Sequence, residues 1–252
     1  MKTVLALSDI HAGSMVGPMP DEYYDVDYDY TYTANTIQSY LFSQWRAMAD
    51  RIGHVDICIV NGDVVEGINK CEEGTGTVST NMMTQCRIAK DLLSMLSVGK
   101  FYFIGGSGYH TKKNTNHDRI VCEMMGGEWV GTHGFINIED VKLHVRHKQS
   151  FSSVPYSRCT SQRKEAFVNR ADGLDVDVYL RSHTHHYYFS GDRHDLTINT
   201  PSWKGLDEFM NNSSQELPDN GYVTMNIDGV NYTWDAYVFN VPLRMYTPTF
   251  TA

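Results

Sequence analysis

The sequence predicts an α/β fold, in which one domain is built on two packed sheets. Strand-like and helix-like segments alternate through the first half of the 252-residue chain. Roughly the last 60 residues instead form apolar runs joined by turn signals, which indicates consecutive strands. No stretch has the composition of a linker, and no segment repeats. We therefore expect residues 1–252 to form a single domain.

Short runs of continuous or alternating apolar residues predict the strands. They cover residues 3–8, 55–61, 100–105, 135–138, 142–147, 175–181, 196–199, 221–228 and 231–239. Apolar residues at steps of three and four predict helices over residues 34–52, 79–97, 116–125 and 161–171. Asp228-Gly229 predicts a hairpin between the last two strands.

Composition restricts the class of protein. The hydrophobic content is 41%, the formal net charge is −9, and no apolar run is long enough to span a membrane. An acidic chain is a poor candidate for sequence-independent binding of DNA or RNA. The apolar start is too short for a signal peptide and is interrupted by Asp9. Five scattered cysteines without a CxxC pair indicate reduced thiols, so we expect a cytoplasmic protein.

One segment, residues 21–32, alternates acidic residues and tyrosines. It follows a stretch rich in glycine and proline, and the simplest interpretation is a solvated insertion loop. The alternative is a lid beside a functional site, because the segment begins soon after Asp9 and His11.

Four clusters of metal-ligand residues follow predicted strands. Asp9 and His11 follow the first strand, and the turn after the second carries Asp63, with Glu66 in a supporting position. His183 and His185 follow the strand at 175–181. Side chains two apart on an extended segment point the same way, so each i, i+2 pair should face one place.

The fourth cluster contains two histidines, which strand alternation separates. His147 continues the apolar face of its strand, whereas His144 lies on the polar face with Lys142 and Arg146. We therefore expect His147 to be a ligand and His144 to be a surface residue. His186 has the opposite parity to His183 and His185 and is expected either to be incidental or to support a ligand from outside.

Two carboxylates and four imidazoles are a suitable donor supply for two adjacent divalent cations. The order Asp-x-His, Gly-Asp-x-x-Glu, strand-end His and His-x-His resembles that of the calcineurin-like metallophosphoesterase superfamily, over essentially the whole chain. Residues 199–203, Asn-Thr-Pro-Ser-Trp, add a similarity to compact phage-type members.

The resemblance implies a four-layer α/β/β/α sandwich with two mixed sheets. It also implies that Asp63 bridges two metal ions. The first ion would be held by Asp9, His11 and His185, and the second by His147 and His183. Manganese is the expected metal, with zinc, iron or nickel as alternatives.

The sequence departs from the family pattern after the strand at 100–105. Members commonly have Gly-Asn-His there, whereas this chain has Gly-Gly-Ser-Gly-Tyr-His, ending at His110. Phage-type relatives resemble this version, so His110 is the catalytic candidate. Ser107 replaces the metal-binding Asn and would be a weak ligand or act through water. Asn116-His117-Asp118 spells the motif more closely, but Asn116 is better explained as a helix N-cap.

The resemblance implies a phosphoesterase in which metal-bound hydroxide attacks phosphorus and His110 protonates the leaving group. Glu66-Gly67 stands where protein phosphatases carry Arg-Gly, which argues against that branch. We expect a phosphodiester substrate, with nucleic acid as one candidate. The alternatives are a phosphomonoesterase, a catalytically silent metal-binding or interaction protein, and a hydrolase of amide bonds. The sequence does not indicate the oligomeric state.

Overall fold

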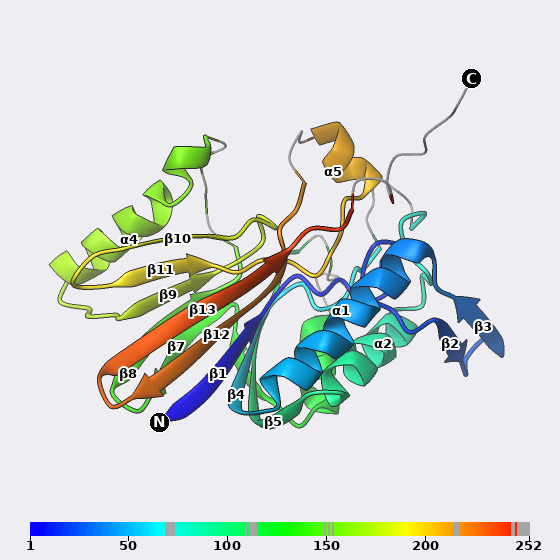
Figure 1. The fold of residues 1–252 in the computed structure, drawn as a ribbon, viewed down its shortest axis with the longest axis horizontal. Helices are drawn as coiled ribbons and strands as arrows, with labels where there is room; N and C mark the ends of the chain where they lie inside the picture. Colours follow the sequence, from blue (N-terminus) through cyan, green and yellow to red (C-terminus); the bar gives the residue numbers. More distant parts are fainter. Residues whose placement is uncertain are drawn as a thin grey trace.

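The computed structural model describes residues 1–68, 74–108, 110, 115–148, 150, 152, 154–213, 217–242 and 245. These residues form a mixed α/β fold with two mixed sheets, as predicted (Figure 1). A two-stranded hairpin lies apart from both sheets.

The first sheet has the strand order β13-β12-β1-β4-β5-β6. Its members are β1 (Lys2–Leu7), β4 (His54–Asn61), β5 (Ser97–Ile104), β6 (Glu128–Gly131), β12 (Asn220–Asp228) and β13 (Asn231–Phe239). Strands β1, β4, β5 and β6 run parallel, and the final hairpin pairs antiparallel with β1. The carboxyl ends of β1, β4 and β5 therefore lie side by side.

The second sheet has the order β10-β11-β9-β8-β7. It contains β7 (His133–Ile138), β8 (Val141–Arg146), β9 (Val178–Arg181), β10 (Tyr188–Gly191) and β11 (Leu196–Asn199). Strands β8 and β9 are parallel neighbours, so the residues that follow them leave the sheet at the same edge. The Asn61 amide donates to the Arg146 carbonyl and to Ser182 Oγ, which joins this edge to the end of β4.

The longer helices lie on the outer faces of the sheets, whereas the short α5 (Glu208–Ser213) lies away from both sheet faces (Figure 1). The longer helices are α1 (Thr36–Ile52), α2 (Met82–Ser94), α3 (His117–Met124) and α4 (Thr160–Ala171), and Pro155–Ser157 forms a 3-10 turn. Asn35 begins α1 with a capping box, in which its side chain accepts from Gln38 N and Gln38 bonds back to its backbone. Asn116 caps α3 by accepting from Arg119 N, as predicted.

Three apolar clusters hold these elements together. The first joins Leu5 and Leu7 of β1 to residues of α1, α2 and α3, such as Trp45 and Leu92. The second joins Val4 and Ala6, on the opposite face of β1, to the inner face of the second sheet. A small third cluster places Ala166 of α4 against Tyr179. Strand β1 is therefore covered on both faces, which explains its uninterrupted apolar run.

The predicted strands and helices all form, with ends that differ by a few residues. Strands β2, β3, β6 and β10 and helix α5 were not predicted. Residues 21–32, expected to be a loop, form the antiparallel hairpin of β2 (Glu22–Asp25) and β3 (Tyr30–Thr33). The four cysteines of the described chain are free thiols. Within the same residues, no helix is long and apolar enough to cross a membrane.

The prediction of a surface position for His144 was wrong. The side chain lies under α4 and its residue is only 3% exposed. It stacks on Phe135, with ring centroids 4.8 Å apart, and its Nδ1 lies 3.1 Å from the buried guanidinium of Arg181. The alternation of polar and apolar residues along β8 indicated that one face of the strand is exposed to solvent, but both faces are covered.

Candidate metal centre

The predicted metal ligands come together at the edge where the strands of both sheets end. Five of them have a positive backbone φ: Asp9 (49°), His11 (48°), Asp63 (49°), His183 (74°) and His185 (58°). Only two other non-glycine residues of the described chain have this conformation. A left-handed backbone is costly for such residues, and it concentrates at sites where side chains must be aimed.

The positive φ angles show that strand alternation was the wrong explanation for the convergence of Asp9 with His11 and of His183 with His185. Strand β1 ends at Leu7 and β9 ends at Arg181, so neither pair lies on an extended segment. The left-handed turns redirect the chain at each ligand residue. The side chains therefore meet through turn conformation rather than through strand alternation.

Asp9 lies at the centre of the site. Its Oδ1 is 3.3 Å from His185 Nε2, 3.9 Å from His11 Nε2 and 3.9 Å from His147 Nε2. Among the described residues, two groups with metal-ligand spacing contain Asp9: one with His11 and His185, the other with Asp63, His147 and His183. The shared carboxylate in this geometry is thus Asp9, whereas the family resemblance gives the bridging role to Asp63.

Asp63 organises the second group. Its Oδ2 lies 2.8 Å from His147 Nε2 and 3.7 Å from His183 Nδ1, and the two imidazole nitrogens are 3.2 Å apart. Ser107 donates to the same carboxylate from its backbone N–H (2.6 Å) and from its hydroxyl (3.2 Å). Ser107 thus contacts the ligand candidate Asp63 directly and holds its carboxylate in place.

Contacts on the side away from the centre orient two of the imidazoles, those of His147 and His11. His147 Nδ1 lies 2.7 Å from the Asn61 carbonyl oxygen, to which it can only donate, so its Nε2 points at the carboxylates. His11 Nδ1 lies 2.9 Å from Glu66 Oε2, which leaves its Nε2 towards Asp9. Such outer contacts set the tautomer and ring orientation of histidines that ligate metals.

The electrostatics of the site fit a bound cation. Burial raises the pKa of a carboxyl, but His147 and other neighbouring imidazoles hold the pKa values of Asp9 and Asp63 well below their usual range. Burial lowers the pKa of His147, yet Asp63 and Asp9 raise it to about 10. The two carboxylates thus create a strongly negative buried position that a proton, or a metal in its place, can neutralise.

The distances between Asp9 Oδ1 and the surrounding imidazole nitrogens also fit a bound metal ion. Asp9 Oδ1 is buried and accepts no hydrogen bond from the described residues, although three imidazole nitrogens surround it at 3.3–3.9 Å. Ligand atoms about 2.1 Å from a tetrahedral ion lie roughly 3.4 Å from one another. The spacing around this oxygen is therefore that of ligands around an ion. Imidazole and carboxylate donors together suit zinc, manganese, iron or nickel.

His110 borders the centre on the side of His11. Their ring centroids are 4.5 Å apart, and His110 Nε2 is 3.7 Å from Asp63 Oδ2. His110 Nδ1 contacts the Glu66 carbonyl oxygen at hydrogen-bond distance, so Nε2 is the atom that faces the site. Burial lowers the pKa of His110. His11, Glu66 and His110 form a third group with ligand spacing.

Lys204 is part of the site but was not among the residues predicted from the sequence. Its ammonium group is buried and lies 2.8 Å from Glu66 Oε1 and 2.7 Å from Asp207 Oδ2. Burial raises the pKa of Glu66, but Lys204 and His11 bring it down to about 2. Glu66 is therefore an ionised link between Lys204 and the ring of His11. No local signal in the sequence points to this lysine, which lies 138 positions from its partner.

Asp118 was also missed, although it belongs to the Asn116-His117-Asp118 segment. Its carboxylate accepts from Val64 N (3.1 Å) and Gly106 N (2.8 Å), and it braces the turns after β4 and β5. A side chain at Gly106 would place its Cβ 2.1 Å from Asp63 Oδ1. The glycine after β5 is thus required for the backbone to approach the ligand candidate Asp63.

Comparisons with known proteins establish the fold. No protein-family model and no curated protein matches the sequence. Among solved structures, Vps29 of Chaetomium thermophilum has a TM-score of 0.51 at 10% identity, over 96% of this chain and 100% of that one. A structure described as a novel archaeal phosphodiesterase has a TM-score of 0.50 at 10% identity, over 93% and 99%. The chain thus shares a metallophosphoesterase-like fold with these proteins.

Proposed function

We propose that this protein is a phosphoesterase that uses two divalent metal ions, and that its substrate is a phosphodiester. The observation that carries the proposal is the position of Asp9, whose buried carboxylate belongs to two adjacent donor groups. Donor groups that share a ligand place two cations close together, as dinuclear phosphoesterases require. The archaeal phosphodiesterase of similar fold supports the same reaction class.

Each residue of the site has a role in this proposal. Two divalent cations would supply Lewis-acid activation of the phosphoryl group and of the attacking water. Asp9, His11 and His185 would hold one ion, and Asp9 together with Asp63, His147 and His183 would hold the other. Ser107 keeps the Asp63 carboxylate in place through two hydrogen bonds. Manganese is the proposed metal, with zinc, iron and nickel as alternatives.

His110 is the proposed acid for the leaving group. Its Nδ1 is engaged by the Glu66 carbonyl, so only Nε2 can carry a proton towards the substrate. That atom lies beside Asp63, within reach of a phosphate ester held at the two donor groups. A positioned histidine of this kind contributes about 10²–10⁴-fold to proton transfer.

Hydrolysis of two chromogenic esters tests the proposal. Bis-p-nitrophenyl phosphate and p-nitrophenyl phosphate are incubated with and without manganese. We expect metal-dependent turnover, faster for the diester, and a loss of about 100-fold or more in His110→Ala. His186→Ala is the matched control because His186 belongs to none of the three donor groups, and it should retain activity.

Metal analysis of the same proteins supplies an independent result. We expect two ions per chain in the wild type and loss of both in Asp9→Asn, because Asp9 is shared. Turnover of the monoester alone would replace the diesterase proposal with a phosphomonoesterase.

A second candidate function is a catalytically silent metal-binding protein. Ser107 favours it, because serine stands where related enzymes carry a metal-binding asparagine. Bound metal without turnover of either ester would support this candidate and reject the enzyme.

The proposed biological setting is that of a compact phage-type phosphoesterase of the cytoplasm. The free thiols of the described cysteines fit a reducing compartment.

A further inference from the structure

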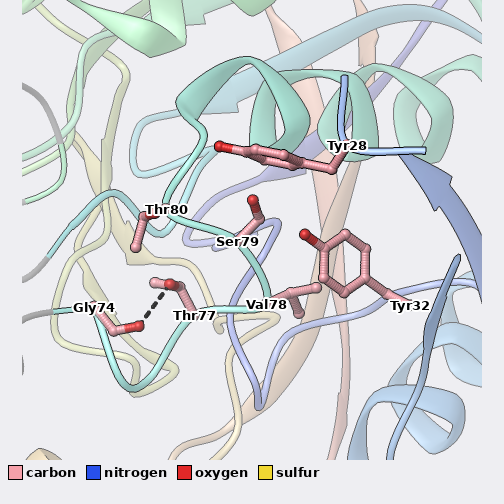
Figure 2. A pocket seen from close by; sticks show the side chains of 7 residues that line it. All are labelled: Tyr28, Tyr32, Gly74, Thr77, Val78, Ser79 and Thr80. Carbon is pink, nitrogen blue, oxygen red and sulfur yellow. Dashed lines mark hydrogen bonds between the residues drawn. The ribbon is translucent and has the colours of Figure 1, made fainter. Parts of the chain in front are cut away.

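A pocket of about 350 Å³ lies between the β2–β3 hairpin and the segment before α2. Tyr28 and Tyr32 enter it from the hairpin, and the segment from Thr77 to Thr80 passes across from them (Figure 2). Of the residues that the structure describes, those that line it are uncharged: Tyr28, Tyr32, Gly74, Thr77, Val78, Ser79 and Thr80. The lining thus combines two aromatic rings with three aliphatic hydroxyl groups, a composition typical of a small-molecule site.

Backbone hydrogen bonds connect this pocket to the chain segment that follows His11. Val78 N donates to the Gly13 carbonyl (2.7 Å), and Met15 N donates to the Gly76 carbonyl (2.9 Å). Gly13 is two residues after His11, and two residues of chain span at most about 7 Å. One wall of the pocket is therefore paired directly with the turn that carries His11.

A second connection runs through Gln85 of α2. Its side-chain amide donates to the carbonyls of Ser79 (2.8 Å) and Gly67 (3.1 Å), and its oxygen accepts from Gly67 N (2.8 Å). Gly67 follows Glu66, whose carbonyl holds His110. The pocket is thus joined to the side of the centre where the leaving-group acid lies.

The hairpin wall is held in position on α2. The buried carboxylate of Asp25 accepts from Thr84 Oγ1 (2.6 Å), and Asp27 accepts two hydrogen bonds from Arg87 (2.8 and 3.0 Å). Asn81, the N-cap of α2, also donates to Asp27 (2.8 Å). The aromatic wall is therefore preorganised, which lowers the ordering cost of binding a ligand.

We propose that this pocket binds the nucleoside of a nucleotide ester whose phosphate lies at the metal centre. This inference rests on the proposed function. The described part of the lining has no charged group to bind the phosphate itself, whereas its tyrosine rings can stack on nucleobases of any sequence. The hydroxyl groups of Ser79 and Thr80 can hydrogen-bond the sugar or the base edges. A net charge of −9 disfavours a long polyanion, so the substrate class is a short nucleotide diester.

Two esters with the same leaving group test the pocket. One is the p-nitrophenyl ester of thymidine monophosphate, and the other is methyl p-nitrophenyl phosphate, which lacks a nucleoside. We expect wild-type kcat/KM to be about 5- to 100-fold higher for the nucleoside ester, since stacking contributes roughly 1–3 kcal/mol per base. Tyr28→Ala should remove most of this preference and leave the methyl ester unchanged.

Two further variants make the test specific. Thr80→Trp, at an exposed residue of the lining, should fill the pocket and lower only the nucleoside-ester rate. Tyr24→Ala is the control, because Tyr24 is as exposed as Tyr28 (56% against 58%) and lies on the same hairpin outside the pocket. It should retain the preference for the nucleoside ester.

The outcomes separate this inference from the proposed function. Turnover of both esters without a preference would overturn the proposal of a nucleoside pocket and leave the proposed phosphoesterase activity standing. An equal loss of kcat/KM for both esters in Tyr28→Ala would have the same meaning. If neither ester is hydrolysed, the pocket is still tested by calorimetry, which compares the affinity of the protein for thymidine monophosphate with its affinity for inorganic phosphate. Tighter binding of the nucleotide that disappears in Tyr28→Ala supports the pocket, and equal binding of the two rejects it.

Discussion

At the scale of single residues, a buried chain of charges supports the candidate metal centre. Lys204 contacts Glu66 and Asp207, and Glu66 contacts the ring of His11. Burying a charge is costly unless a partner is present, so each member depends on the next. The same chain sets the direction of the His11 ring, and thereby the position of its Nε2 beside Asp9.

Substitution of Lys204 by methionine should therefore be strongly destabilising. It removes the cation and leaves Glu66 ionised in the interior, a change that typically costs about 3–5 kcal/mol. We expect this loss in the free energy of unfolding measured with urea. Lys204→Arg retains the charge and should lose much less.

A double-mutant cycle distinguishes the ion pair from lost packing. Glu66→Gln removes the carboxylate that Lys204 neutralises, so Lys204→Met should cost much less in that background. Equal costs of Lys204→Met in both backgrounds would show that Glu66 and Lys204 are not coupled.

At the scale of elements, the β2–β3 hairpin is a fixed part of the fold. Tyr23 is 8% exposed and packs in the cluster of α1 and α2, and Asp25 is held by Thr84. The outward-facing residues of the hairpin are acidic residues and tyrosines, so the composition of the segment resembled that of a solvated loop. The inward positions, at every second residue of β2, carry the anchoring contacts.

Removal of one hydroxyl should loosen the hairpin selectively. Thr84→Val preserves shape but deprives the buried Asp25 carboxylate of a donor, which costs about 1–3 kcal/mol. We expect amide hydrogen exchange in residues 22–33 to accelerate by about 5- to 100-fold, with α1 unchanged. Thr31→Val, at an exposed position of β3, is the control. Uniform acceleration over the whole chain would show that the hairpin does not open as a separate unit.

At the scale of the whole molecule, a polar network joins α4 to the second sheet. The buried Arg181 donates to Glu165 of α4 (2.8 Å) and to the His144 carbonyl (2.8 Å). Burial and the guanidinium of Arg181 lower the pKa of His144 to about 4, from an ordinary value of 6.5. His144 is therefore neutral in the folded protein at neutral pH.

This network predicts a loss of stability in acid. Between pH 6.5 and 4 the unfolded chain binds a proton at His144 that the folded chain excludes, so stability falls as the pH is lowered through this range. The contribution is at most about 3 kcal/mol. His144→Asn should flatten the dependence of the unfolding free energy on pH in that range. The exposed His194→Asn should leave it unchanged, and an unaltered slope in His144→Asn would contradict the assignment.

The predictability of the site differed from residue to residue. The gathering of Asp9, Asp63, His147 and His185 could be predicted because each lies within a few residues of the end of an apolar run, and strand ends gather at one edge of a sheet. The burial of His144 could not be predicted, because alternation along a strand does not reveal whether its second face is covered. Asp118 was not singled out because it lies in the segment Asn116-His117-Asp118, which was interpreted only as the start of a helix. That interpretation was correct, since Asn116 is the N-cap of α3.

The sequence alone determined the α/β class, the order of the main strands and helices, and the supply of carboxylates and imidazoles at their ends. These properties follow from local periodicity, and each is encoded within a short window of residues. Only the tertiary structure decided that Asp9 is shared by two donor groups, that Lys204 neutralises Glu66, and that a tyrosine-lined pocket forms between the β2–β3 hairpin and the segment before α2. These arrangements depend on contacts between distant segments, whose energies arise only when the chain packs.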